Sequence, residues 1–553
     1  MPRFPRLAPL ACLAAATALA GCNLAPKNLR PDLPVPPSWP VGDPYLAQSE
    51  AALPSVTWRQ VFLDPRLQQI IVEALANNRD LRVAVANIAA ARAEYRIQRA
   101  DLFPEVDGLA RYTRSGGGSG TSTIASTGST GSTGTGTAGS GTTGTGTTGT
   151  GAGTGTTGTG ATSGGTSTSS TVTSTATNSF LLDAGVTAFE LDLFGRVRSL
   201  TRAQQDLFFA QQAAARATRL SLIGNVATAW LDYAADASLL KVAQQTADVA
   251  QSSVRLTEAR LRGGIAPRTD LTQAQTILAT AQADLASQRT LLAQDANALQ
   301  LLVGAPVELK LLSTDIEQAA NTIAPLPAGL DSRILLRRPD VVQAEYQLYA
   351  ANAQIGAARA ALLPKISLTG LAGLASSALS SLFTGGAFTY SLGAAASYPI
   401  FRAGAGIAGV RYSQAERDVY LATYEKAIQT AFQETSDALA REGTLVDQVR
   451  ANRRGVAASQ ETLNLVNAQY RGGIATFLSS LDAQRTLYAS QQTLVSTLLA
   501  GAANRATLYR VLGGDSTLDA TPGGPRPVTQ TGAPRDEEPL PPANSASRKA
   551  KQP

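Results

Sequence analysis

One short motif occurs twice in this chain, each time between two long segments that lack proline. Leu261-Arg262-Gly263-Gly264-Ile265-Ala266 returns as Tyr470-Arg471-Gly472-Gly473-Ile474-Ala475. Glycine favours the left-handed conformation that ends a helix, and it weakens a helix interior by about 1 kcal/mol relative to alanine. Each copy of the motif is therefore predicted to be the tip of a helical hairpin.

The segments that lead into the two tips are too long for ordinary globular helices. Arg198 to Arg262 and Arg411 to Arg471 contain no proline and run for 65 and 61 residues. As helices they would be roughly 95 and 90 Å long. The predicted return helices, Asp270 to Val303 and Phe477 to Leu512, are shorter. Helices of this length require a coiled coil, a long bundle or a helical tube.

The second half of the chain repeats the first. The segment that ends at Pro364 matches the one that ends at Pro104, at an offset of 260 (364 minus 104), and the tips match at an offset of 209 (472 minus 263). Most of the difference is a Gly/Thr/Ser-rich insertion in the first half. The sequence therefore predicts an internal duplication.

Each half is also predicted to contain two strands, because apolar and polar residues alternate with a period of two. The strand segments are Val106–Thr113, Phe180–Ala188, Ile366–Thr369 and Phe388–Tyr398. Tyr112, Tyr390 and Tyr398 suit the aromatic girdles of a membrane interface, although a half-buried soluble sheet gives the same pattern.

Two helices are expected before the first strand, between Pro65 and Phe103, because apolar residues recur there at helical spacing. The break between them is predicted at Asn77-Asn78. Asp80 is the expected N-cap of the second helix.

Residues 115–178 are almost wholly Gly, Thr and Ser. Such a segment lacks the apolar residues needed to offset the entropy of ordering, so it is predicted to be a disordered loop. A role as an adhesin or glycan carrier has only the abundance of hydroxyl groups in its favour. The Pro-rich tail, residues 515–553, is also predicted to be disordered.

The N-terminus has the features of an exported lipoprotein. Residues 1–21 combine two arginines with an apolar run that is too short to span a bilayer, as in a signal peptide. They end in Leu19-Ala20-Gly21-Cys22, which resembles a bacterial lipobox and implies an N-palmitoyl, S-diacylglycerol group on Cys22. An ordinary signal peptide with an incidental cysteine is the alternative. Residues 22–64 are rich in proline and are predicted to be extended.

Composition excludes several classes of function. The chain has no histidine, and its only cysteines are Cys12 and Cys22, so its body has no imidazole or thiol for a metal site or a nucleophile. We therefore expect no enzyme activity, no metal and no cofactor other than the lipid on Cys22. A net charge of +6 spread over 553 residues is typical of a solvated surface and disfavours nucleic-acid binding.

Four strands cannot close a membrane barrel. An open sheet edge in lipid leaves backbone groups unpaired at several kcal/mol each, and known barrels begin at about eight strands. Two copies of the chain would give a filled barrel of eight strands, whereas three would give twelve strands and room for a channel.

Several motifs in the right order resemble the TolC-like outer-membrane factors, and most closely the lipoprotein branch called NodT or OprM type. The motifs are Phe189–Arg196, Leu335–Val341, Ala350–Gly356, Leu363–Leu368 and Tyr398–Phe401. The resemblance covers roughly Val56 to Gly514, apart from the Gly/Thr/Ser loop.

This resemblance implies a mostly α fold with a membrane β part. Three chains would form a 12-stranded β-barrel, with four strands per chain, continuous with a long periplasmic α-barrel. The first repeat would span residues 65–304, with an extracellular loop at 115–178, and the second 336–514. Residues 305–335 would be an equatorial linker.

The family also implies a function. The chain would be the outer-membrane channel of a tripartite efflux pump in a Gram-negative bacterium, lipid-anchored, and a passive exit duct for drugs or small toxic compounds. Its partners would be two further copies, a periplasmic membrane-fusion adaptor, an inner-membrane RND-type transporter and outer-membrane lipid. The alternatives are the duct of a type I protein secretion system and a periplasmic coiled-coil spacer without a pore.

The resemblance assigns roles to the tips. The adaptor would dock on Arg262, Gly263, Gly264 and Ile265, and on Arg471, Gly472, Gly473 and Ile474. Asp270 and Asp482 would form the periplasmic gate, where rings of like charge attract cations and raise pKa values. For Asp270 an N-cap is an equal alternative, and for Asp482 a solvated surface is the weaker one.

Overall fold

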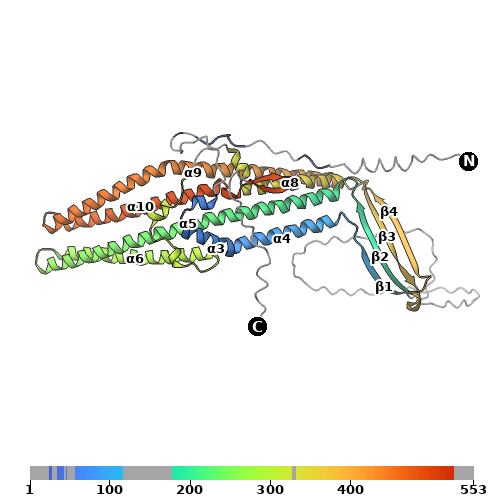
Figure 1. Cartoon of the computed structure of the whole chain (residues 1–553), viewed down its shortest axis with the longest axis horizontal. Helices are drawn as coiled ribbons and strands as arrows, with labels where there is room; N and C mark the ends of the chain where they lie inside the picture. Colours follow the sequence, from blue (N-terminus) through green and yellow to red (C-terminus); the bar gives the residue numbers. More distant parts are fainter. Residues whose placement is uncertain are drawn as a thin grey trace, which may run out of the picture. The chain divides into compact units, whose positions relative to one another are not determined.

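The computed structural model describes residues 24–27, 34–40, 42, 45, 57–115, 177–326 and 332–528. The signal peptide, Cys22, the Gly/Thr/Ser loop beyond Ser115 and the last 25 residues lie outside the described residues. The chain divides into two compact units (Figure 1). A helical unit contains Met1–Pro104, Glu190–Ser367 and Ala395–Pro553, and a strand unit contains Glu105–Phe189 and Leu368–Ala394.

The helical unit contains two copies of one helix pattern, which confirms the predicted duplication. In each copy a helix of 22 residues comes first, one of 67 residues follows, and one of 36 or 35 residues returns beside it (Figure 1). The first copy is α4 (Arg79–Ala100), α5 (Arg196–Arg262) and α6 (Arg268–Val303); the second is α8 (Pro339–Ala360), α9 (Ala405–Arg471) and α10 (Phe477–Val511). Both hairpins are where the sequence predicts them.

Short elements join and brace these helices. They are α2 (Trp58–Val61), α3 (Pro65–Asn77), η1 (Leu309–Leu311), α7 (Ile316–Asn321), η2 (Ser332–Arg337), η4 (Gly514–Ser516), β5 (Leu518–Thr521) and β6 (Gly524–Pro527). Within the described residues, no helix is both long enough and apolar enough to cross a lipid bilayer.

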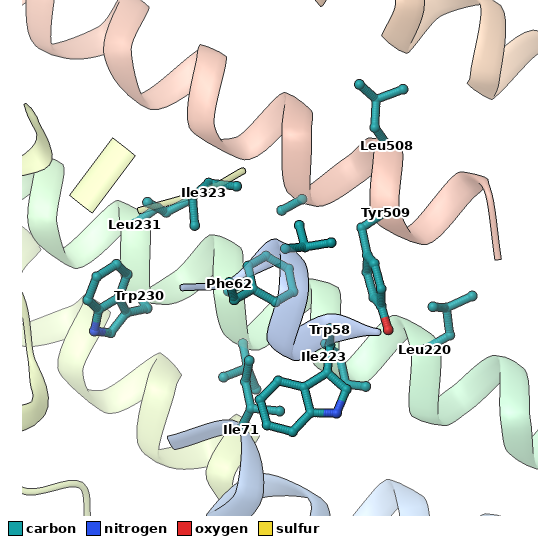
Figure 2. Packing of buried hydrophobic residues seen from close by; sticks show 14 of the residues in the cluster. Trp58, Phe62, Ile71, Leu220, Ile223, Trp230, Leu231, Ile323, Leu508 and Tyr509 are labelled. Atoms are coloured by element: carbon teal, nitrogen blue, oxygen red, sulfur yellow. The ribbon is translucent and has the colours of Figure 1, made fainter. Parts of the chain in front are cut away.

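The main core lies where α2, α3, α5 and α10 meet the segment after α6 (Figure 2). Trp230 is fully buried there, and its indole N–H donates to the Leu311 carbonyl oxygen at 3.0 Å. The rings of Phe62 and Tyr509 pack edge to face with centroids 5.5 Å apart. This core joins both repeats, because α5 belongs to the first and α10 to the second.

The break between α3 and α4 confirms one prediction and corrects another. It lies at Asn77-Asn78, as predicted, but the N-cap is Asn78 and not Asp80. The Asn78 side-chain oxygen accepts from the Leu81 amide at 2.9 Å, and its Nδ2 donates to the Leu302 carbonyl oxygen at 2.8 Å. Asp80 lies in the first turn of α4 instead, where its negative charge interacts favourably with the positive end of the helix dipole.

The prediction of a disordered tail from Asp515 is wrong for its first residues. β5 and β6 form an antiparallel hairpin in which Leu518 is fully buried. The Tyr346 hydroxyl donates to the Thr521 carbonyl oxygen and accepts from the Thr521 amide, both at 2.9 Å. The hairpin thus packs on α5 and α8, and η4 precedes it. Residues 529–553 lie outside the described part.

The strand unit contains one sheet with the strand order β1-β2-β3-β4. Its strands are β1 (Asp107–Ser115), β2 (Thr177–Leu191), β3 (Lys365–Ser376) and β4 (Phe388–Ser397), close to the predicted segments. β1 and β2 are antiparallel, with Tyr112 opposite Phe180. No residue of the four strands is buried, and large apolar side chains such as Tyr390 and Leu392 are 73% and 83% exposed. The sheet therefore has no core of its own within the described chain.

Packing of α5 against α6 brings three carboxyl groups together. Asp232 and Asp236 are half-buried one turn apart on α5, and Asp295 is half-buried on α6. Burial, followed by the charge of Asp236, raises the pKa of Asp295 to about 7. Burial also raises the pKa of Asp236 and of Asp232. Asp295 is therefore the carboxyl group of the three that is most easily protonated near neutral pH.

This raised pKa makes stability depend on pH. The folded chain binds the Asp295 proton more tightly than the unfolded chain, whose carboxyl has a pKa of 3.8, so the contribution of Asp295 to stability falls as pH rises from about 4 to about 7. We expect Asp295→Asn to raise the thermal midpoint clearly at about pH 8 and to raise it less at about pH 5, where only part of this loss has occurred. Thermal unfolding of the purified protein at both pH values measures this. Asp248→Asn, an exposed site on α5, is the control, and an equal shift at both pH values would contradict the prediction.

Candidate functional site

The first hairpin tip ends α5 with a Schellman motif, the helix end that needs a left-handed residue. Gly264 supplies that conformation, with φ of +73°. Its amide donates to the Leu261 carbonyl oxygen at 3.0 Å, and the Ile265 amide donates to the Arg260 carbonyl oxygen at 2.8 Å. The second glycine of the pair is thus the one that the turn requires, since Gly263 has an ordinary φ of −80°.

The second tip has the same backbone. Gly473 has φ of +76°, its amide donates to the Tyr470 carbonyl oxygen at 3.1 Å, and the Ile474 amide donates to the Gln469 carbonyl oxygen at 2.9 Å. All eight predicted docking residues are exposed. Ile265 and Ile474 are 70% and 83% exposed, so each tip presents an apolar side chain to its surroundings.

A direct contact joins the two tips. The Arg260 guanidinium lies over the Tyr470 ring, 4.7 Å from its centroid, and its Nη1 donates to the Tyr470 carbonyl oxygen at 3.0 Å. Cation–π contacts of this kind are worth about 0.5–2 kcal/mol, depending on desolvation. The α5–α6 and α9–α10 hairpins are therefore fastened to each other beside their tips.

An apolar cluster lies directly behind this contact. Tyr470 packs on Phe477 with ring centroids 5.6 Å apart, and Ala274 and Leu481 complete the buried group. These residues come from α6, α9 and α10, and the half-buried Val254 adds α5. All four long helices thus meet at one small core near the tips.

The two predicted gate carboxylates lie near the starts of the return helices, Asp270 in the first turn of α6 and Asp482 in the second turn of α10. Asp270 is the third residue of α6 and is half-buried. It is not an N-cap, because Pro267 holds that position and has no side-chain cap bond. Asp482 is the sixth residue of α10 and is exposed. Their gating role stays a prediction.

The residues that follow the predicted lipid site are held on α8. The Arg359 Nη1 donates to the Leu24 carbonyl oxygen at 3.0 Å. A Cβ atom at Gly356 would lie only 2.9 Å from the Cα and N atoms of Ala25, so only glycine allows this approach. Residues 24 and 25 thus dock on the last turns of α8. Cys22 itself lies outside the described residues.

Sequence reasoning missed two sets of residues. Arg260 directly precedes the first tip motif and Tyr470 is the first residue of the second. Both break the repeat, since the offset of 209 pairs them with Gln469 and Leu261. This mismatch between the two repeats is the sequence feature that could have indicated a special role for Arg260 and Tyr470. The second set is the cluster of three carboxyl groups from Asp232, Asp236 and Asp295. The sequence shows that Asp232 and Asp236 are four residues apart on one helix, but it does not show that Asp295 packs beside them.

The chain matches the family model described as "Outer membrane efflux protein" over residues 70–146, 153–305 and 330–514. It is 39% identical over 498 residues to the toluene efflux pump outer membrane protein TtgC of Pseudomonas putida, a match that covers 90% of this chain and 93% of that protein. It is 34% identical over 499 residues to the cation efflux system protein CusC of Escherichia coli, covering 90% and 97%.

A solved structure agrees with these matches. The open state of the MtrE outer membrane channel of Neisseria gonorrhoeae superposes with a TM-score of 0.71 and 29% identity, covering 89% of this chain and 98% of that chain. These findings confirm the resemblance that the sequence motifs carry, and with it the efflux role and the outer-membrane location in a Gram-negative bacterium. The chain belongs to the outer membrane efflux protein family and is an outer-membrane channel component of an efflux pump.

Proposed function

We propose that three copies of the chain form one continuous exit duct, with a barrel of twelve strands in the outer membrane and a tube of long helices in the periplasm. The main support for this proposal is that the sheet of β1, β2, β3 and β4 contains no buried residue. Its exposed apolar side chains need a lipid or protein environment, and its outer strands, β1 and β4, need partners. Three copies supply twelve strands and leave a lumen, which two copies would fill.

The tips are the periplasmic end of this duct and the docking sites of a membrane-fusion adaptor. Six tips of two kinds would surround a trimer, because Pro267 to Asp270 follow one tip and Thr476 to Ser479 the other. An adaptor that inserts between neighbouring hairpins would meet the exposed isoleucines, Ile265 and Ile474. An inner-membrane RND-type transporter completes the tripartite pump.

The cargo is a class of small toxic organic compounds. The toluene pump relative is more similar to this chain than the cation pump relative, at 39% against 34% identity. The chain works as a passive duct and not as an enzyme, because its body has no imidazole or thiol group.

The first test is electrical. Purified trimers in a planar bilayer are expected to conduct ions, with a preference for cations that comes from the rings of Asp270 and Asp482. Replacing both by Ala should move the reversal potential toward zero in a salt gradient. The control is Asp447→Ala, an exposed carboxylate away from the tips, which should leave the reversal potential unchanged. No conductance from the double variant would rule out the duct.

The second test concerns the shape of a tip. Gly473→Val forces a β-branched residue into the left-handed region, at a cost of about 1–2 kcal/mol, so the position of Ile474 should change and efflux should fall. Gly472→Ala is the matched control, because its φ of −75° suits any residue and its Cβ would lie 3.6 Å from the nearest atoms. Dye accumulation in cells without another outer-membrane channel measures efflux, and native mass measurement checks the trimer. Normal efflux by Gly473→Val would argue against docking at this tip.

The third test concerns the anchor. Cells that carry the wild-type chain and grow with an alkyne-labelled fatty acid should yield a labelled protein. Cys22→Ser should abolish the label, whereas Cys12→Ser, inside the signal peptide, should leave it intact. A label that persists in Cys22→Ser would remove the lipoprotein assignment.

A further inference from the structure

A groove in the helical unit has no role in the duct proposed above. It has a volume of about 500 Å³ and lies between α7, α9 and α10. Its floor is apolar and includes Leu445, Val449 and Leu498. Its lining contains four arginines and a single acid, Glu442, so the groove combines an oily floor with a positive rim.

Not all of these arginines are available to a ligand. The Arg505 Nε donates to Glu442 at 3.0 Å, and its Nη1 donates to the Ile323 carbonyl oxygen at 3.1 Å. Asn504 also donates to Glu442, at 3.1 Å. Arg505 and Glu442 are therefore committed to holding α9, α10 and the end of α7 together.

The other three arginines, Arg450, Arg453 and Arg454, are exposed to solvent, and the ion pairs that two of them form are weak. Arg450 pairs with Asp447 at 2.7 Å and Arg453 pairs with Glu317 at 2.8 Å, but both partners in each pair are about half exposed or more. Exposed pairs of this kind contribute little and exchange readily. Arg454 has no ion pair with any residue that the structure describes. The rim can therefore bind an incoming row of carboxylates.

We propose that the groove binds the C-terminal tail of this chain, through Asp536-Glu537-Glu538 on the arginine rim and Leu540 on the apolar floor. The order of residues fits, since three acids precede an apolar side chain that proline residues flank on both sides. Proline lowers the entropy that an extended segment loses when it binds. One basic residue, Arg535, directly precedes the three acids, so this stretch keeps a net charge of −2. Arg548, Lys549 and Lys551 come later and would lie outside the groove.

The tail is long enough to reach. The Val528 amide donates to the Thr517 carbonyl oxygen at 3.1 Å, so the tail leaves the body just after the end of α10. The arginine rim lies beside Thr497 of α10, whose hydroxyl accepts from Asn452 of α9 at 2.8 Å. Thr497 is fourteen residues before the end of α10, which is about 21 Å along a helix. The eight residues from Val528 to Asp536 can span up to about 26 Å. The docked tail would lie across α7, α9 and α10. This proposal does not depend on whether the duct conducts ions.

A photo-crosslinker in the full-length chain tests this proposal. p-Benzoyl-phenylalanine replaces Leu540, membranes are irradiated, and mass spectrometry maps the linked peptides. We expect links to residues 442–454 or 498–505, in the same copy or in a neighbouring copy. Neutralising the tail with Asp536→Asn, Glu537→Gln and Glu538→Gln should lower the yield roughly fivefold, as the loss of three weak exposed pairs predicts.

Two further variants make the test specific. Arg450→Gln, Arg453→Gln and Arg454→Gln together should lower the yield to the same extent. Neutralising the same number of charges at the end of the tail, with Arg548→Gln, Lys549→Gln and Lys551→Gln, should leave the yield unchanged. Links that fall elsewhere on the chain or on another protein, or yields that ignore the acidic triplet, would overturn the proposal.

Discussion

Backbone hydrogen bonding in lipid is the constraint on which the architecture depends. A sheet of four strands has two outer strands, here β1 and β4, and each has one row of N–H and C=O groups without a strand partner in the described chain. Water can satisfy such groups but a bilayer cannot. One chain is therefore an incomplete object in the outer membrane. Its apolar strand residues, exposed in the single chain, are consistent with a sheet that is finished only by other copies and by lipid.

The helical unit meets a different constraint. Helices of 67 residues do not hold their shape through local propensity alone and depend on packing. The chain supplies that packing at two levels: the main core around Trp230 and the smaller core behind the tips. The contact between Arg260 and Tyr470 belongs to the second level and fastens one repeat to the other where few apolar residues are available.

The sequence predicted those features that arise locally. A Gly-Gly pair between long helical segments requires a helix end, and a period of two requires a strand, so the hairpins and strands could be predicted without knowledge of their neighbours. The contacts made across the chain could not. Arg260 and Tyr470 are 210 residues apart, and only folding brings them together. The predicted N-cap of α4 was wrong for the same reason. Asn and Asp are both good N-caps, and the hydrogen bond from Asn78 to the Leu302 carbonyl oxygen, 224 residues away, favours Asn78.

The C-terminal hairpin was missed because its composition, rich in Pro and Gly, resembles a disordered tail. Its stability comes from Tyr346 and from Phe209, which lie on helices of the two different repeats. This arrangement has a consequence for biosynthesis. Proteins are made and exported N-terminus first, so both repeats reach the periplasm before the segment that clasps them. A chain that stops short of Leu518 would carry β1 to β4 and all the long helices described above, but it would lack the contacts that the hairpin makes with Tyr346 and Phe209. Packing between the two repeats at this point can therefore be completed only after both repeats have been exported.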